Sequence, residues 1–220
     1  VGQSRVVLST VTAGTPPVAQ ETICGTTDDR TLSFDNRAAR HFPIGCTSWM
    51  INDFNTGFLT AGHCLTDASD VMQFEVPLST SGGAMVSPPV NRQFPVHGPS
   101  VQQRETVIGD DWGYFGVLPN NEGFTPFQVY GTRHTLSASA PAVSGQTIRI
   151  TGYGTVSSPV SATWNLVQKT HTGAYFDRIG DRLEYRVDTT GGNSGSAIQN
   201  LSTGQAIGIH TNAGCGTSST

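Results

Sequence analysis

The sequence predicts an all-β protein in which short antiparallel strands form a sandwich or a pair of barrels. The composition indicates this class, because charged residues make up only 13% of the 220 residues while the chain contains 26 glycines and 12 prolines. Thr, Ser, Val and Gly predominate, as they do in short strands joined by tight turns. The sequence contains no unit that repeats at a fixed period and no heptad pattern, which excludes solenoids and coiled coils.

The strands expected at 46–51 and 58–61 flank a turn and predict a β-hairpin. Antiparallel pairing brings the two open ends of a hairpin together, so Cys46 and Cys64 are expected to form a disulfide. Closing a loop of this size contributes about 3 kcal/mol in the chain-entropy model. The same bond would hold the backbone beside His63 rigid.

Further strands and turns follow along the chain. Alternating apolar and polar residues predict a half-buried strand at 183–187. The other expected elements are strands at 71–76 and 146–154 and a second hairpin within 196–211. Segment 118–128 is rich in turn residues and is expected to be a loop that joins two halves of the chain.

Charge and cysteine content exclude several classes of protein. The net charge of −4 argues against a nucleic-acid-binding protein. No apolar run reaches the roughly 18 residues of a membrane-spanning helix. The four cysteines lack the paired C-x-x-C spacing of a zinc site, so two disulfides and no metal are expected. Disulfides favour secretion into an oxidising environment.

Three residues in the order His63, Asp111 and Ser194 suggest nucleophilic hydrolysis. A serine hydroxyl needs a base to take its proton, and that base needs a partner to fix its tautomer and stabilise its cation. His63 is the candidate base. Asp111 is the candidate partner because it directly precedes an apolar run that would bury it, whereas Asp110 is the competing assignment. The alternative that His63 has only a structural role is disfavoured by the small residues that precede it.

The glycine-rich turn around Ser194 offers a site for the charge that develops during acyl transfer. The backbone N–H groups of Gly192 and Ser194 are the expected oxyanion hole. Gly192 lacks a side chain, so its backbone can approach a substrate closely. One such donor is typically worth about 3–4 kcal/mol of transition-state stabilisation.

The motifs "TAGHC", "DDWGYF", "TGYG" and "TTGGNSGS" together resemble the chymotrypsin-like serine peptidases. Within that family the chain is most similar to the bacterial-type glutamyl endopeptidases, from about Cys24 to the last residue. The resemblance implies two six-stranded antiparallel β-barrels with the active site in the cleft between them. It places His63 and Asp111 in the first barrel and Ser194 in the second.

The resemblance also implies a substrate pocket. His210 and the hydroxyl of Thr189 would read the carboxylate of the substrate, which favours cleavage after Glu and more weakly after Asp. The segment Thr211-Asn212-Ala213 would pair with the substrate backbone as an antiparallel strand. In trypsin-like relatives an acidic residue at the spacing of Asp188 selects Arg or Lys, so that preference is the first alternative. The second alternative is a catalytically inactive homologue that acts as a binding protein.

The chain departs from the family pattern in three ways. Residues 1–22 are extra and are expected to be an extension or the remnant of a pro-segment. Asn193 replaces the aspartate that pairs with a new N-terminus when trypsin-like enzymes are activated, so that switch should be absent. The family would continue beyond Thr220 with a strand and a helix, and we expect a further segment that completes the second barrel.

The resemblance also implies the domain bounds, the second disulfide, the oligomeric state and the partners of the protein. The peptidase domain would span 23–220, with a first barrel at about 23–120 and a second at about 125–220. The remaining cysteines, Cys24 and Cys215, are expected to pair beside the specificity pocket. The protein would be a secreted monomer that acts on protein or peptide substrates without a cofactor, and it would bind neither nucleic acid nor a membrane.

Overall fold

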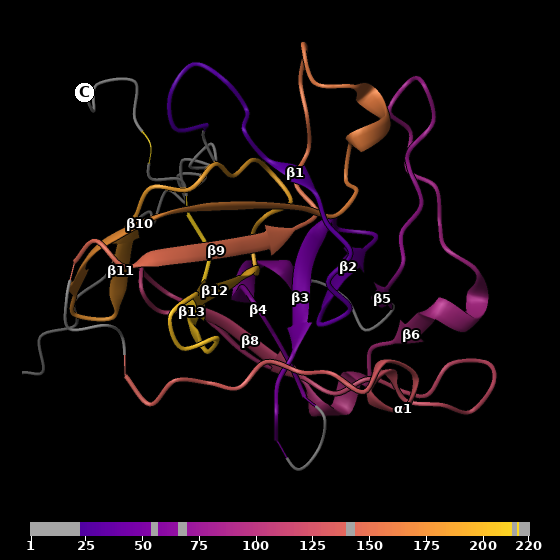
Figure 1. Ribbon diagram of the computed structural model, residues 1–220. Coiled ribbons are helices and arrows are strands. Elements are labelled where there is room, and N and C mark those ends of the chain that lie inside the picture. Colours follow the sequence, from indigo (N-terminus) through magenta and orange to yellow (C-terminus); the bar gives the residue numbers. More distant parts are fainter. Residues whose placement is uncertain (1–22, 54–56, 66–69, 140–143, 213–214, 216–220) are drawn as a thin grey trace, which may run out of the picture.

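The computed structural model describes residues 23–53, 57–65, 70–139, 144–212 and 215. Two antiparallel sheets dominate these residues, and Figure 1 shows mostly strands and loops with only short helical segments. The extension at 1–22 and Ala213 lie outside the described residues. None of the helices in the described part of the chain is long and apolar enough to cross a membrane.

The first sheet has seven strands in the order β6-β5-β2-β3-β4-β8-β7, one more than the expected six. Its strands are β2 (Ala38–Phe42), β3 (Cys46–Met50), β4 (Phe58–Thr60), β5 (Val71–Gln73), β6 (Gln93–Pro95), β7 (Gln102–Glu105) and β8 (Asp111–Phe115). Its core is built from fully buried large apolar side chains, among them Met50, Phe58, Phe74, Phe94 and Phe115.

The second sheet has six strands, with the path β1-β10-β9-β12-β13 and β11 paired to β10. Its strands are β1 (Thr31–Leu32), β9 (Thr147–Gly152), β10 (Lys169–Ile179), β11 (Arg182–Tyr185), β12 (Ala197–Asn200) and β13 (Ala206–Ile209). Ile148, Ile150, Tyr175 and Ile198 of these strands form a separate apolar cluster with Val187, which follows β11.

Both predicted hairpins are present. Strands β3 and β4 pair with Trp49 opposite Leu59, and β12 pairs with β13. Cys46 and Cys64 form the disulfide expected at the open end of the first hairpin, with Cα atoms 6.1 Å apart. The strand expected at 71–76 is shorter than predicted and ends at Gln73.

Helical structure is confined to short segments. Helix α1 (Pro126–Tyr130) lies at the end of the expected loop 118–128. It begins at a capping box between Thr125 and Gln128 and ends at Gly131, whose φ of 67° suits a glycine. The 3₁₀ turns are η1 (Gly62–Cys64), η2 (Val90–Arg92), η3 (Gly98–Ser100) and η4 (Ala162–Trp164).

Strand β1 differs from the expected grouping, because it belongs to the second sheet although its sequence lies within 23–120. Thr31 pairs with Thr170 of β10, and Figure 1 shows the indigo β1 beside the brown β10. The preceding segment is fastened to the second half by the Cys24–Cys215 disulfide and by Asp188, which accepts a hydrogen bond from the Cys24 N–H at 2.7 Å. These anchors carry β1 away from the first sheet.

The two sheets meet through an apolar contact that includes Trp49 and Ala38 of the first sheet and Ala197 and Ala206 of the second half. The Trp49 indole N–H donates to the carbonyl of Gly195 at 2.9 Å. This bond reaches the residue directly after Ser194, so the contact between the sheets also positions the glycine-rich turn.

Candidate active site

His63 and Asp111 lie on neighbouring segments of the first sheet. His63 sits in turn η1 directly after β4, and Asp111 is the first residue of β8, which pairs with β4. The His63 Nδ1 and Asp111 Oδ2 atoms are 2.7 Å apart, and the His63 backbone N–H donates to Asp111 Oδ1 at 3.1 Å. Two hydrogen bonds to one carboxylate therefore fix both the ring and the backbone of His63.

The two candidate carboxylates have different environments. Burial by itself raises the pKa of Asp111, but the hydrogen bonds and the charge of His63 outweigh it and hold the pKa below its usual value. Asp110 instead accepts from the Arg104 guanidinium at 2.9 Å and from the Thr106 hydroxyl at 2.5 Å. Of these two carboxylates, Asp111 is the one that contacts His63, as the sequence favoured.

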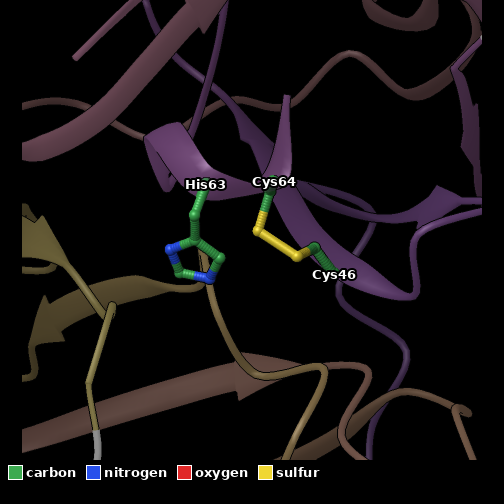
Figure 2. A group of neighbouring side chains, drawn as sticks. All are labelled: Cys46, His63 and Cys64. Carbon is green, nitrogen blue, oxygen red and sulfur yellow. A yellow bond between two sulfur atoms is a disulfide. The ribbon is translucent and has the colours of Figure 1, made fainter. Parts of the chain in front are cut away.

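The disulfide Cys46–Cys64 braces the same turn. Figure 2 shows Cys64 and His63 leaving η1 together, with the disulfide beside the imidazole ring. The two sulfurs and the imidazole lie within 4.8 Å of one another, a spacing that would suit a metal ion. Both sulfurs are consumed by the disulfide bond, so they cannot act as thiolate ligands.

The turn that carries Ser194 is seated against the hairpin that leads to His63. The Thr47 N–H donates to the Ser194 carbonyl at 2.9 Å, and that carbonyl oxygen lies 3.8 Å from the Cys64 sulfur. Gly195 has a φ of +88°, and a Cβ there would come within 2.1 Å of the Thr47 carbonyl oxygen. Only glycine permits this close approach, which brings the Ser194 backbone beside the first sheet.

The Gly191–Gly192 peptide is held in one orientation. Its carbonyl, from Gly191, accepts the Thr155 N–H at 2.8 Å. In a trans peptide the N–H points away from the carbonyl, so the Gly192 N–H is directed to the opposite side. Gly192 has a φ of +102°, and a Cβ would meet the Tyr153 carbonyl oxygen at 2.6 Å.

A cavity of about 710 Å³ is lined by residues of both halves of the chain, including Asp111 and Tyr185. The sequence-predicted residues in its wall are Asp111, Thr189, His210, Thr211, Asn212 and Cys215.

His210 is buried in that wall, and its Nδ1 lies 2.6 Å from the hydroxyl of Tyr185. Its backbone brackets the nucleophile turn, since the His210 N–H donates to the Ser196 carbonyl at 2.8 Å and its carbonyl accepts from Gly195 at 2.7 Å. The cavity wall and the Ser194 turn are therefore one hydrogen-bonded unit.

The carboxylate of Asp188 binds backbone N–H groups of this chain and does not line the cavity. Its side chain is buried, with Oδ1 accepting from the Cys24 N–H at 2.7 Å and Oδ2 from the Asp29 N–H at 2.9 Å. It is absent from the residues that line the cavity, although the adjacent Thr189 is among them. Asp188 fastens the segment before β1 to the second sheet.

A comparison of the sequence with family models matches the trypsin-like peptidase domain over residues 46–209. This chain belongs to the trypsin-like peptidase family. Its two-sheet architecture is the chymotrypsin-like fold, as the motifs predicted.

Among curated relatives, a glutamyl endopeptidase of Bacillus licheniformis is 30% identical to this trypsin-like peptidase, and the match covers 92% of this chain. It spans 65% of the length of that relative. A solved Glu endopeptidase in complex with MPD superimposes with a TM-score of 0.61 at 19% identity, covering 84% of this chain and 85% of that one.

More distant solved structures have the same fold. Neuropsin, a serine protease of mouse brain, gives a TM-score of 0.60 at 16% identity and covers 86% of this chain and 89% of that one. Human heparin binding protein gives 0.60 at 13% identity, with 86% and 87% covered.

Sequence reasoning missed two residues of this trypsin-like peptidase site. Tyr185 contacts His210 from a strand 25 positions away in the chain. Arg30 contacts Asn193 across 163 positions at 3.1 Å and has a buried side chain. Neither contact has a local sequence signal, because both arise from the packing of segments that are remote in the chain.

Proposed function

We propose that this chain is a serine endopeptidase that cleaves after Glu, and more weakly after Asp, through an acyl-enzyme on Ser194. The observation that carries the proposal is the doubly hydrogen-bonded His63–Asp111 pair beside the turn that holds Ser194. An imidazole oriented by a carboxylate next to a serine is the arrangement that activates a hydroxyl for acyl transfer.

In the proposed mechanism the Ser194 oxygen attacks the scissile carbonyl while His63 Nε2 takes its proton. Asp111 holds the Nδ1–H and stabilises the imidazolium that forms. The N–H groups of Gly192 and Ser194 receive the negative charge that develops on the carbonyl oxygen. His63 then protonates the leaving amine, and a water molecule activated by the same imidazole hydrolyses the acyl-enzyme and restores Ser194.

The cavity supports a preference for acidic side chains. A Tyr185 hydroxyl that donates to Nδ1 of His210, at 2.6 Å, leaves the imidazole proton on Nε2. That N–H and the hydroxyl of Thr189 are the proposed donors to a substrate carboxylate. Thr211, Asn212 and Ala213 are proposed to pair with the substrate backbone.

The alternative preference for Arg or Lys has less support. It needs the Asp188 carboxylate as a counter-charge, and both oxygens of that group already accept backbone N–H groups of the segment before β1. A substrate cation would have to break those bonds in a buried environment. The glutamyl endopeptidase relative and the wall residue His210 both favour Glu.

The proposed function also implies partners and a compartment for the protein. Protein or peptide substrates are the proposed partners, and a monomer needs no second copy to complete the residues named above. The two disulfides support export to an oxidising compartment.

Labelling with a fluorophosphonate tests the nucleophile. We expect the wild-type protein to be labelled on Ser194 and to cleave a peptide with one Glu. Ser194→Ala should abolish labelling and lower kcat on the order of 10⁶-fold, since the members of a triad act as a unit.

Circular dichroism should show that the Ser194→Ala variant remains folded. A folded wild-type protein that neither reacts with the probe nor cleaves the peptide would contradict the proposal and favour the inactive binding homologue.

A further inference from the structure

We infer that Arg30 is a positioning residue that holds the oxyanion-binding turn in its working shape. This inference rests on the proposed function and adds a residue to it. Arg30 lies just before β1, and its side chain is only 1% exposed. Its guanidinium reaches the two residues, Thr190 and Asn193, that flank the Gly191–Gly192 peptide.

The guanidinium has an acceptor for each of its five N–H donors. Nη1 donates to the Thr190 hydroxyl at 2.6 Å and to Asn193 Oδ1 at 3.1 Å. Nη2 donates to the Thr155 carbonyl at 2.8 Å and to Asp28 Oδ2 at 2.6 Å, while Nε donates to Asp28 Oδ1 at 2.8 Å. A buried group that is saturated in this way has one stable geometry, so it acts as a fixed point.

The contacts of Arg30 close a ring around the oxyanion peptide. Asn193 Oδ1 also accepts from the Thr190 N–H at 3.0 Å, which pins the two ends of the turn together. Thr155, whose carbonyl Arg30 holds, donates its N–H to the Gly191 carbonyl. The orientation of the Gly192 N–H therefore depends on atoms that the guanidinium fixes on both sides.

The position of Arg30 is itself fixed from the other side. Asp28 balances the charge through a bidentate pair, and the pKa of Asp28 lies below its usual value because these bonds outweigh the effect of its burial. The next residue, Asp29, donates its backbone N–H to Asp188. The chain near Arg30 is thus tied to the second sheet independently of the guanidinium.

Gly154 explains why the motif "TGYG" accompanies this arrangement. A Cβ at Gly154 would lie 2.1 Å from Asn193 Oδ1 and 2.5 Å from Arg30 Nη1. Only glycine leaves room for the guanidinium and the Asn193 side chain to meet. Lysine at position 30 would offer three donors on a point charge and would lack the planar fork that spans Asn193, Thr155 and Asp28.

Arg37 provides a matched control. It makes the same local pair with Asp35, in which its backbone N–H, Nε and Nη2 donate at 3.0, 2.8 and 2.6 Å. Among the described residues, the side chain of Arg37 hydrogen-bonds to Asp35 alone. Arg37→Ala therefore removes a similar but more exposed ion pair without touching the Ser194 turn.

The test compares Arg30→Ala, Arg30→Lys and Arg37→Ala on a peptide with one Glu, with thermal unfolding measured for each. We expect Arg30→Ala to lower kcat by roughly 10²-fold, the effect of losing one oxyanion donor, with KM nearly unchanged. Guanidinium chloride below its denaturing concentration should restore part of that kcat by filling the space that the side chain leaves. Arg30→Lys should be intermediate, and Arg37→Ala should match the wild type.

Each outcome decides the inference. A folded Arg30→Ala with the kcat of Arg37→Ala, a loss confined to KM, or a loss that guanidinium does not restore would overturn it. If Arg30→Ala does not fold, a native-like Arg30→Lys carries the test, and wild-type kcat in that variant overturns the inference. An inactive wild-type protein that fails to react with a fluorophosphonate would instead contradict the proposed function.

Discussion

Asp110 and Asp111 are adjacent in sequence and differ in what they contact. Asp111 accepts from both the ring and the backbone of His63, whereas Asp110 pairs with Arg104 at a more exposed position. Asp111→Asn should lower kcat by about 10³–10⁴-fold, because an amide cannot hold the same tautomer or stabilise the imidazolium. Measurement of kcat on the Glu peptide checks this.

The neighbouring residue supplies the control for that prediction. Asp110→Asn changes the same chemical group one position away and should leave kcat near the wild-type value, because Asp110 contacts a largely exposed Arg104 and the Thr106 hydroxyl rather than His63. Equal losses in the two variants would show that His63 is not oriented by Asp111.

At the scale of single residues, motifs predicted the bond between His63 and Asp111 but not the supporting contacts. His63 and Asp111 lie in short motifs, and the residues beside them in the sequence favour a catalytic role over a structural one. No sequence pattern assigns a role to Tyr185 or Arg30, because their roles depend on which distant residues they contact. Asp188 was open to two interpretations until its acceptor bonds to the backbone were known.

At the scale of elements, the buried ring of His134 should contribute to a loss of stability in acid. It bridges to Ile51 beyond β3 and packs edge-on against Trp49. Burial, with a smaller effect from the charge of Arg37, lowers the pKa of His134 to about 4. The unfolded chain, with a pKa of about 6.5, binds a proton between these values that the folded protein does not.

His134 should therefore contribute its full stabilisation above about pH 6.5. The free energy of unfolding should fall as the pH drops towards 4, by up to about 3 kcal/mol from this group. Urea unfolding at several pH values checks the slope. His134→Gln removes the titration and should flatten that part of the curve. If the variant loses as much stability as the wild type over this window, the assignment to His134 is wrong.

The elements themselves were predictable where a local pattern exists. The two hairpins follow from turn residues between apolar strands. Helix α1 has a sequence signal in Thr125, Gln128 and Gly131, although the turn residues of 118–128 predict a loop there. Strand β1 had no such signal, because two residues cannot specify a partner. Its place in the second sheet follows from the disulfide and the acceptor bonds of Asp188.

At the scale of the whole molecule, the two sheets create the site by meeting. One contributes His63 and Asp111, and the other contributes Ser194 and the cavity wall around His210. The resemblance implied this division between the two halves of the chain. The resemblance implied the bond between Cys24 and Cys215, but not that β1 joins the second sheet or that Arg30 contacts the turn beside Ser194, since these depend on the packed structure.

The most direct test is the cleavage profile of the wild-type protein and of His210→Ala on a mixed peptide pool. Cleavage after Glu should dominate, with less after Asp. His210→Ala should reduce the Glu-over-Gln ratio of kcat/KM by on the order of 10–100-fold while turnover of Gln peptides persists. Wild-type cleavage after Arg or Lys, or a Glu-over-Gln ratio that His210→Ala leaves unchanged, would contradict the proposed glutamyl specificity.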